Sequence, residues 1–131
     1  GVNVQLDSDC SEFDCFSAFV NREIIKSIKT ETNRYAGDKI AEMKRKKTMK
    51  EKSIWQRWSG VKLCEIYFFF SIILHMCVVK LPKISYYWST DPFYSSAWAR
   101  KLISRDRFTS ILFMLHLNDN ATFVKRGETW P

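Results

Sequence analysis

The sequence lacks the closely paired cysteines that structural zinc sites use. Its cysteines are Cys10, Cys15, Cys64 and Cys77. No two of them are separated by only two residues, and His75 and His116 lie among apolar residues, so the spacing matches no zinc-ligand pattern. We therefore expect four reduced thiols in an intracellular protein.

A basic segment followed by an apolar run is also missing from the start of the sequence, so we expect no secretion leader. The sequence begins with Gly1 rather than methionine and ends on Trp130 and Pro131. We interpret it as an excerpt of a larger multidomain protein.

Long hydrophobic runs are scarce. The most hydrophobic one, IYFFFSIILHMCVV at residues 66–79, contains Ser71 and His75 and is shorter than the roughly 20 residues that cross a bilayer. It is typical of a helix buried on most sides that ends before Pro82, so we expect no membrane partner. His75 has no second ligand one turn away, which favours a core or edge histidine over a metal ligand.

Motifs for metal-dependent catalysis are missing as well, since the sequence contains no H-E-x-x-H. Asp91, Asp106 and Asp119 could in principle form a carboxylate cluster, but each has a structural role as a cap, a first-turn anion or a turn residue. We therefore expect that this chain alone is not an enzyme and holds no metal or other cofactor.

The sequence is rich in core-forming residues and in positive charge. With 131 residues, of which 46% are hydrophobic and 15% aromatic, it has ample material for one packed core. The net charge of +7 and the pI near 9.3 indicate a polyanionic partner, either nucleic acid or an acidic membrane surface.

Helical spacing and caps predict an all-α fold, an irregular helical bundle of about five helices without a sheet. We expect helices near residues 11–19, 21–36, 61–79, 95–102 and 105–117. The second helix could end at Gly37 or continue through Ile40 and Met43, and Asp91 with Pro92 offers a helix start as an alternative to Ser95 or Ser96. The predicted core comprises Phe69, Ile73, Trp88, Phe108, Leu112 and Leu115.

Residues 44–52, KRKKTMKEK, contain six lysines or arginines against one glutamate. Three interpretations stay open, namely a solvated linker or helix end, a strip that contacts phosphates, and a nuclear-localisation signal. The chain accordingly divides into an N-terminal helical segment at 1–43, a basic linker at 44–59 and a further helical region at 60–131.

Residues 86–108, YYWSTDPFYSSAWARKLISRDRF, combine aromatic side chains with arginines. We expect Tyr87, Trp88 and Phe108 chiefly to pack the short helix against the long apolar one. Stacking on DNA bases is the alternative, because aromatic residues interleaved with basic ones can also indicate nucleic-acid binding.

Three blocks in this order carry a resemblance to a known family. They are ETNRYA at 31–36, VVKLPKISYYWSTDP at 78–92 and SRDRFTSILFMLHLNDN at 104–120. Together they resemble the piggyBac transposases and their domesticated, transposable-element-derived relatives, and the matching blocks cover most of residues 13–120. The resemblance implies a cut-and-paste DNA transposase, of which this chain is the helical part ahead of the catalytic core.

The resemblance also implies that residues 60–131 serve dimerization and the binding of terminal repeats in double-stranded DNA. They would lead into an RNase H-like core beyond this chain, where three aspartates hold divalent metals such as Mg²⁺. A homodimer and a location in the nucleus follow from the same resemblance. The alternative function is a helical protein-interaction module of a domesticated transposase that no longer binds DNA.

For DNA contacts, two groups of basic residues are the candidates. The first group is Lys44, Arg45, Lys46 and Lys47. The second group, Arg100, Lys101, Arg105 and Arg107, surrounds predicted helix ends, where backbone N–H groups and guanidinium groups suit phosphate oxygens. Arg107 could instead pair with Asp106 at the surface.

Overall fold

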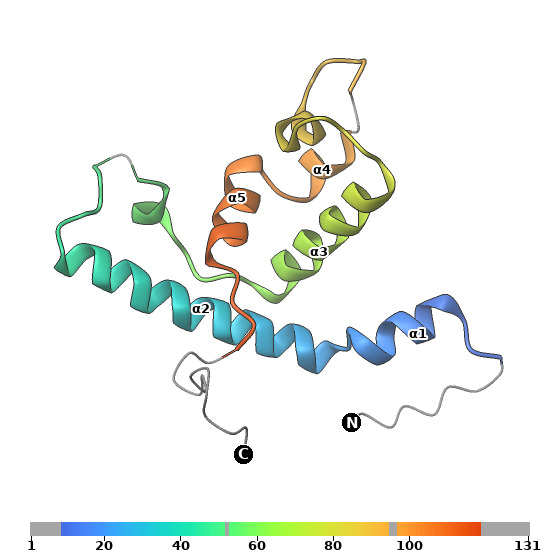
Figure 1. Cartoon of the computed structure of the whole chain (residues 1–131), viewed down its shortest axis with the longest axis horizontal. Coiled ribbons are helices and arrows are strands. Elements are labelled where there is room, and N and C mark those ends of the chain that lie inside the picture. Colours follow the sequence, from blue (N-terminus) through green and yellow to red (C-terminus); the bar gives the residue numbers. More distant parts are fainter. Residues whose placement is uncertain (1–8, 52, 95–96, 119–131) are drawn as a thin grey trace, which may run out of the picture.

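The computed structural model of the chain describes residues 9–51, 53–94 and 97–118. Over these residues the fold is all-α, with five α-helices, two short 3₁₀ helices and no strand, which confirms the predicted irregular bundle. In Figure 1 the long helix α2 (Arg22–Arg45) runs along one side, and α3 (Leu63–Val78), α4 (Ala97–Leu102) and α5 (Arg105–Met114) gather beside it. No helix in the described part of the chain is long and apolar enough to cross a membrane.

The first helix, α1 (Glu12–Phe19), is held by its cap rather than by packing. Ser11 Oγ accepts a hydrogen bond from the backbone of Asp14, whose carboxylate accepts one from the Ser11 backbone, so the two residues form a capping box. The helix has no buried residue. Its exposed aromatic side chains are Phe13, Phe16 and Phe19.

Helix α2 begins where the sequence predicts, because the Asn21 side chain accepts a hydrogen bond of 2.9 Å from the Ile24 backbone. It does not stop at residue 36 but passes through Gly37 and ends at Arg45. Glu42 explains part of this length, since it pairs with Lys39 at 3.4 Å and with Lys46 at 2.6 Å. Such pairs one turn apart support an exposed helix.

The segments on either side of α3 form short 3₁₀ helices that spacing did not predict. They are η1 (Ile54–Arg57) and η2 (Ile84–Trp88). Asp91 heads a turn instead of capping α4, since its carboxylate accepts a hydrogen bond from the Phe93 backbone and its carbonyl accepts one from Tyr94. Helix α4 begins only at Ala97, and the alternative starts at residues 95 and 96 lie outside the described residues.

Helix α5 begins at the predicted cap, where Ser104 Oγ accepts a hydrogen bond of 3.2 Å from the Arg107 backbone. It ends at Met114, three residues before the predicted end. The cause lies in α2, because the Thr32 hydroxyl donates to the His116 carbonyl and accepts from the His116 N–H. The Tyr35 ring also stacks on His116, with 4.2 Å between ring centroids.

One buried cluster joins α2 to α3, α4 and α5, with Ile25 and Ile28 contributing beside Phe69 and Phe108. The predicted core residues Ile73, Trp88 and Leu115 pack against this cluster and are partly buried.

Leu112 is 41% exposed, so its place in the predicted core is wrong. Helix α5 instead turns Ile111, Met114 and Ser110 inward. The Ser110 hydroxyl donates to the Asp106 carbonyl, which lets a polar side chain occupy the buried face.

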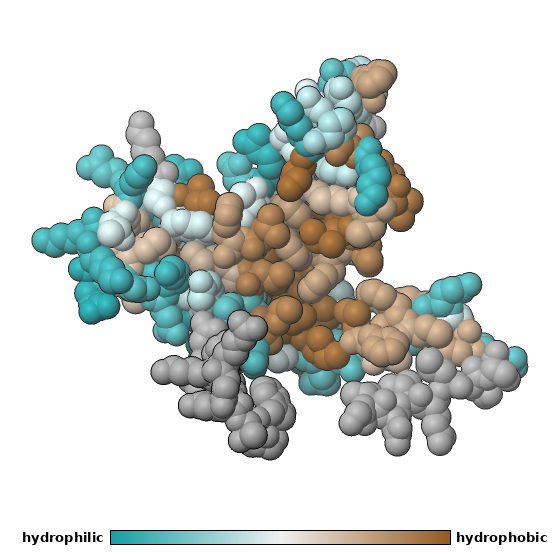
Figure 2. Space-filling model, in the orientation of Figure 1, coloured by the Kyte–Doolittle hydropathy of each residue, from teal (hydrophilic) through white to brown (hydrophobic). Residues whose placement is uncertain are grey.

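The surface has a hydrophobic part over the packed helices and a hydrophilic part around the end of α2. Figure 2 shows hydrophobic residues gathered over the middle of this face and hydrophilic ones around the far end of α2, at the left. That hydrophilic end carries the basic residues 44–47.

Candidate nucleic-acid interface

The first basic cluster, Lys44–Lys47, is built around the end of α2. Lys44 and Arg45 form the last turn, Lys46 is the C-cap, and Lys47 has a φ of 53°. The Lys47 N–H bonds to the Lys44 carbonyl and the Thr48 N–H to the Met43 carbonyl, each at 3.1 Å. This is a Schellman motif, in which a non-glycine residue holds the left-handed position.

All four side chains of this cluster are exposed. Lys46 pairs with Glu42, whereas Lys44 and Lys47 line a hollow of about 520 Å³ together with Met49 and Gln56. Two of the four cations thus line a concave surface, and basic groups in such a position concentrate positive potential.

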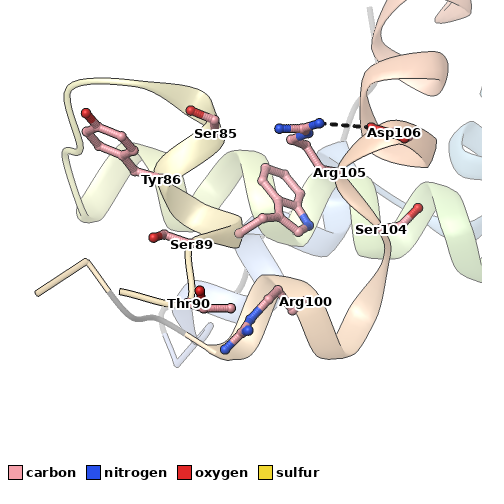
Figure 3. Close-up of a pocket in the computed structure, with 9 residues that line it drawn as sticks. Ser85, Tyr86, Ser89, Thr90, Arg100, Ser104, Arg105 and Asp106 are labelled. Atoms are coloured by element: carbon pink, nitrogen blue, oxygen red, sulfur yellow. Dashed lines mark hydrogen bonds and ion pairs between the residues drawn. The ribbon is translucent and has the colours of Figure 1, made fainter. Parts of the chain in front are cut away.

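The second basic cluster lies around a groove of about 700 Å³ between η2, α4 and α5. Arg100 of α4 and Arg105 of α5 line it from different helices, as Figure 3 shows. Lys101 is exposed beside Arg100 in the last turn of α4. Other lining side chains carry hydroxyl groups, which are donors to phosphate oxygens. They are Ser85, Tyr86, Ser89, Thr90 and Ser104.

Arg105 makes only a weak, exposed ion pair. Its guanidinium lies 3.4 Å from Asp106, with the two side chains 59% and 78% exposed. Exposed pairs of this kind contribute about 0–1 kcal/mol, so Arg105 is free to exchange Asp106 for a phosphate.

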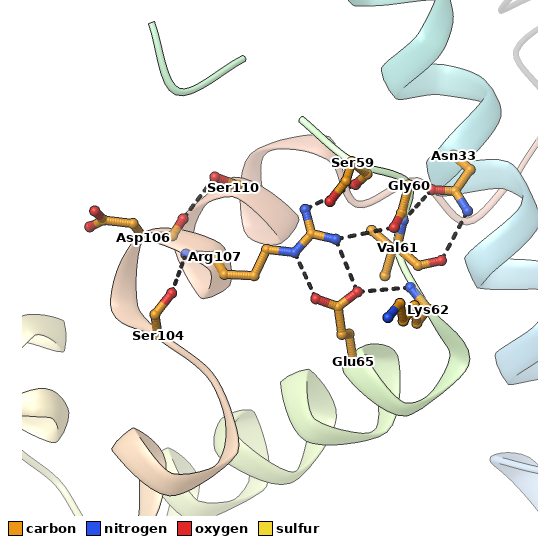
Figure 4. A network of polar contacts seen from close by, with 10 residues as sticks. All are labelled: Asn33, Ser59, Gly60, Val61, Lys62, Glu65, Ser104, Asp106, Arg107 and Ser110. Carbon is orange, nitrogen blue, oxygen red and sulfur yellow. Dashed lines mark hydrogen bonds and ion pairs between the residues drawn. The ribbon is translucent and has the colours of Figure 1, made fainter. Parts of the chain in front are cut away.

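Arg107 differs from the other seven predicted contacts because its donors point into the protein (Figure 4). Nε donates to Glu65 Oε1 at 2.7 Å and Nη2 to Glu65 Oε2 at 2.9 Å. The same guanidinium donates to the carbonyls of Ser59 and Gly60 and lies over the Trp58 ring. Its side chain is 19% exposed. The surface pair with Asp106 that the sequence left open is not formed, and Arg107 instead ties α5 to the start of α3.

Hydrogen bonds from Arg107 lower the pKa of Glu65 below its ordinary range. Partial burial opposes the shift, while the Lys62 backbone N–H and the charge of Arg107 add to it. A carboxyl with a lower pKa in the folded protein stabilises the fold above its unfolded pKa, about 4.3 for glutamate. That contribution disappears as the pH falls through the lower folded pKa.

We therefore expect Glu65→Gln to destabilise the protein clearly at pH 7 and much less at pH 3. The measurement is urea unfolding of wild type and variant at both values, with Glu23→Gln as the control because Glu23 pairs with Lys26 at an exposed site. An equal loss at both pH values would contradict an ionised Glu65 in the pair.

The aromatic residues that were predicted to pack within residues 86–108 do so. Phe108 is 1% and Tyr87 4% exposed, and the Tyr87 hydroxyl donates to the Val79 carbonyl. Trp88 is partly buried, donates from Nε1 to the Ile103 carbonyl at 2.8 Å and lies 4.9 Å from the Phe108 ring. The Nε1 donor and the ring of Trp88 thus make their contacts within the protein.

Acidic residues do not assemble a metal site in the part of the chain that the structure describes, where no three His, Cys, Asp or Glu side chains could hold an ion. Asp91 and Asp106 have the separate partners given above, and Asp119 lies outside the described residues. The Mg²⁺ that the resemblance implies therefore has no set of ligands among the described residues. The four cysteines are free thiols, and His75 lies beside the rings of Tyr87 and Trp98.

No solved structure matches the chain. A family model described as Transposase IS4 matches residues 11–129, nearly the whole sequence. Transposases are enzymes, so the prediction that this chain is not an enzyme is wrong. The helices, the two basic clusters and the core described above all lie within the matched range, and the chain belongs to the IS4 transposase family.

Proposed function

We propose that this chain is the DNA-binding and dimerization region of a cut-and-paste transposase of the piggyBac type, or of a domesticated derivative. The piggyBac assignment is supported by the three sequence blocks, and DNA as the partner by the transposase family. On this proposal the protein acts in the nucleus as a homodimer and binds the terminal repeats of a transposon.

The observation that carries the DNA-binding proposal is the pairing of basic side chains with concave surfaces. Lys44 and Lys47 line one hollow, and Arg100 and Arg105 line the groove between η2, α4 and α5. Seven residues are the proposed phosphate contacts: Lys44, Arg45, Lys46, Lys47, Arg100, Lys101 and Arg105. We assign Arg107 the structural role that its contacts with Glu65 indicate.

Neutralising the first cluster by substitution of all four residues with glutamine should weaken binding to every duplex tested. Each phosphate contact contributes about 0.9 to the slope of log K against log salt, so the slope should flatten by about three to four units. Affinity measured by fluorescence anisotropy at several salt concentrations gives this slope.

The matched control removes the same charge from the same helix, away from its basic end. It substitutes Arg22, Lys26, Lys29 and Lys39 with glutamine. An equal change of slope in both variants would mean that only net charge matters and would overturn the assignment of the cluster. A loss confined to one DNA sequence would mean that the cluster reads bases, and no binding to any duplex would favour the protein-interaction alternative.

The groove is tested separately with Arg100→Gln and Arg105→Gln in one chain. We expect a smaller flattening of about two units, because two phosphate contacts are lost. Unchanged binding in both this variant and the four-residue variant would exclude DNA binding through these surfaces.

A further inference from the structure

The segment that ends α2 places a threonine directly after its four basic residues. Thr48 follows Lys44, Arg45, Lys46 and Lys47 directly, so arginine stands three residues before it and lysines fill the positions between. Serine/threonine kinases of the basophilic class select substrates by positive charge at these positions. We propose that Thr48 is phosphorylated by a kinase of this class and that the phosphate weakens DNA binding by the Lys44–Lys47 cluster; the second half rests on the proposed function.

The structure favours Thr48 as the acceptor because its side chain is accessible. Thr48 is exposed, and residues 48–50 form no helix. Its hydroxyl makes one weak contact, a hydrogen bond of 3.3 Å to the Met43 carbonyl. Helix ends fray readily, and once the bonds from the Lys47 and Thr48 N–H groups open, residues 45–48 can extend into the active site of a kinase.

Two serines have a lysine at the same distance but a different setting. Lys101 precedes Ser104, and Lys50 precedes Ser53, each by three residues. Both serines are N-caps, whose hydroxyl oxygens accept bonds from the backbones of Arg107 and Trp55. Modification at either serine removes a hydroxyl that accepts the cap bond of a helix start, whereas the Thr48 hydroxyl is a donor to the Met43 carbonyl at a helix end.

The transfer itself is chemically complete with a nucleoside triphosphate as the donor. Thr48 Oγ1 forms a bond to the γ-phosphorus while the bond from that phosphorus to the β–γ bridging oxygen breaks and the nucleoside diphosphate leaves. The hydroxyl proton passes to a base of the kinase. The product carries a charge of about −1.5 to −2 at neutral pH.

That charge acts on the cluster in two ways. It offsets about two of the four neighbouring cations, so fewer counterions are released when DNA binds. It also removes the hydroxyl that donates to Met43 and puts negative charge at a helix C-terminus, which the helix dipole disfavours. Both effects lower the affinity of this surface for a polyanion.

The acceptor is identified with the whole chain, ATP and a purified basophilic kinase. Peptide mass spectrometry should find phosphate at position 48 in the wild type and in Thr48→Ser, and none there in Thr48→Ala. Arg45→Gln should slow the modification about tenfold or more, whereas Lys50→Gln, a change of equal charge after the acceptor, should leave its rate unchanged. Phosphate on Ser53 or Ser104 instead, or none at all, overturns the proposed site.

The consequence is measured on random-sequence duplex DNA with modified and unmodified protein. We expect affinity to fall about tenfold or more at low salt and the salt slope to flatten by about two units, while Thr48→Ala treated in the same way keeps its affinity. Full modification with unchanged DNA affinity overturns the regulatory role but leaves the DNA-binding proposal intact. If the unmodified protein binds no DNA, the proposed function fails and the regulation with it, whereas the mass-spectrometric result stands by itself.

Discussion

Replacing Phe108 with alanine should destabilise the protein by about 3–5 kcal/mol, the usual range for a buried aromatic residue. Phe108 is 1% exposed, and its ring lies 4.9 Å from both Phe69 and Trp88. Its removal leaves a cavity where α5 meets α3 and η2, and the rings on either side lose their packing partner. Urea unfolding followed by circular dichroism measures the change.

Phe113→Ala is the matched control, because it removes the same side chain from the same helix. Phe113 is 66% exposed, and its ring lies at right angles to the Trp55 ring with 6.1 Å between the ring centroids. We expect a loss of about 1 kcal/mol or less there. Comparable losses at both positions would show that the packing at Phe108 is not what holds α5 in place.

Arg107→Ala should destabilise the protein by about 2–3 kcal/mol. The substitution leaves the Glu65 carboxylate without its bidentate partner and two backbone carbonyls without a donor. Breaking a buried pair from one side costs about 3–5 kcal/mol, and the lower value expected here reflects the partial access of water to this pair. Arg107→Lys should recover only part of the loss, since an ammonium group cannot bridge both carboxylate oxygens and the carbonyls at once.

Arg105→Ala is the control, because it removes one positive charge from α5 without breaking the hydrogen bonds that Arg107 makes. It lies two residues away in the same helical turn, and its pair with Asp106 is exposed. The free energy of unfolding, measured by thermal and urea unfolding, should change by about 0.5 kcal/mol or less. If Arg107→Ala were equally mild and weakened DNA binding instead, its side chain would belong to the DNA-binding surface rather than to the fold.

The helices were predictable because their signals are local. Asn21, Ser104 and the capping box of α1 lie within three residues of the groups that they bind, so a sequence alone reveals them. The end of α5 was not predictable, since Thr32 sets it from a distance of 84 residues along the chain. The exposure of Leu112 was missed because Ser110, a polar residue, takes a place on the buried face.

In the candidate site, too, the local features were predictable and those that depend on distant residues were not. Clustering of lysine and arginine identified both basic clusters, but their concave form depends on Gln56 of η1 and on the hydroxyls of η2, which lie in separate segments. The role of Arg107 depends on Glu65, 42 residues earlier. The one local signal for it was Glu65 itself, placed three residues after Lys62 at a helix start.

Helix α2 also connects separate parts of the fold. It has 24 residues, about 36 Å at 1.5 Å per residue. Residues in its middle contact the backbone before α3 and the residues after α5. Asn33 bonds to both backbone groups of Val61, and Thr32 and Tyr35 hold His116. The basic end at Lys44 belongs to the same continuous helix as these attachments, so a partner bound there is linked by one helix to the entry of α3 and to the exit of α5.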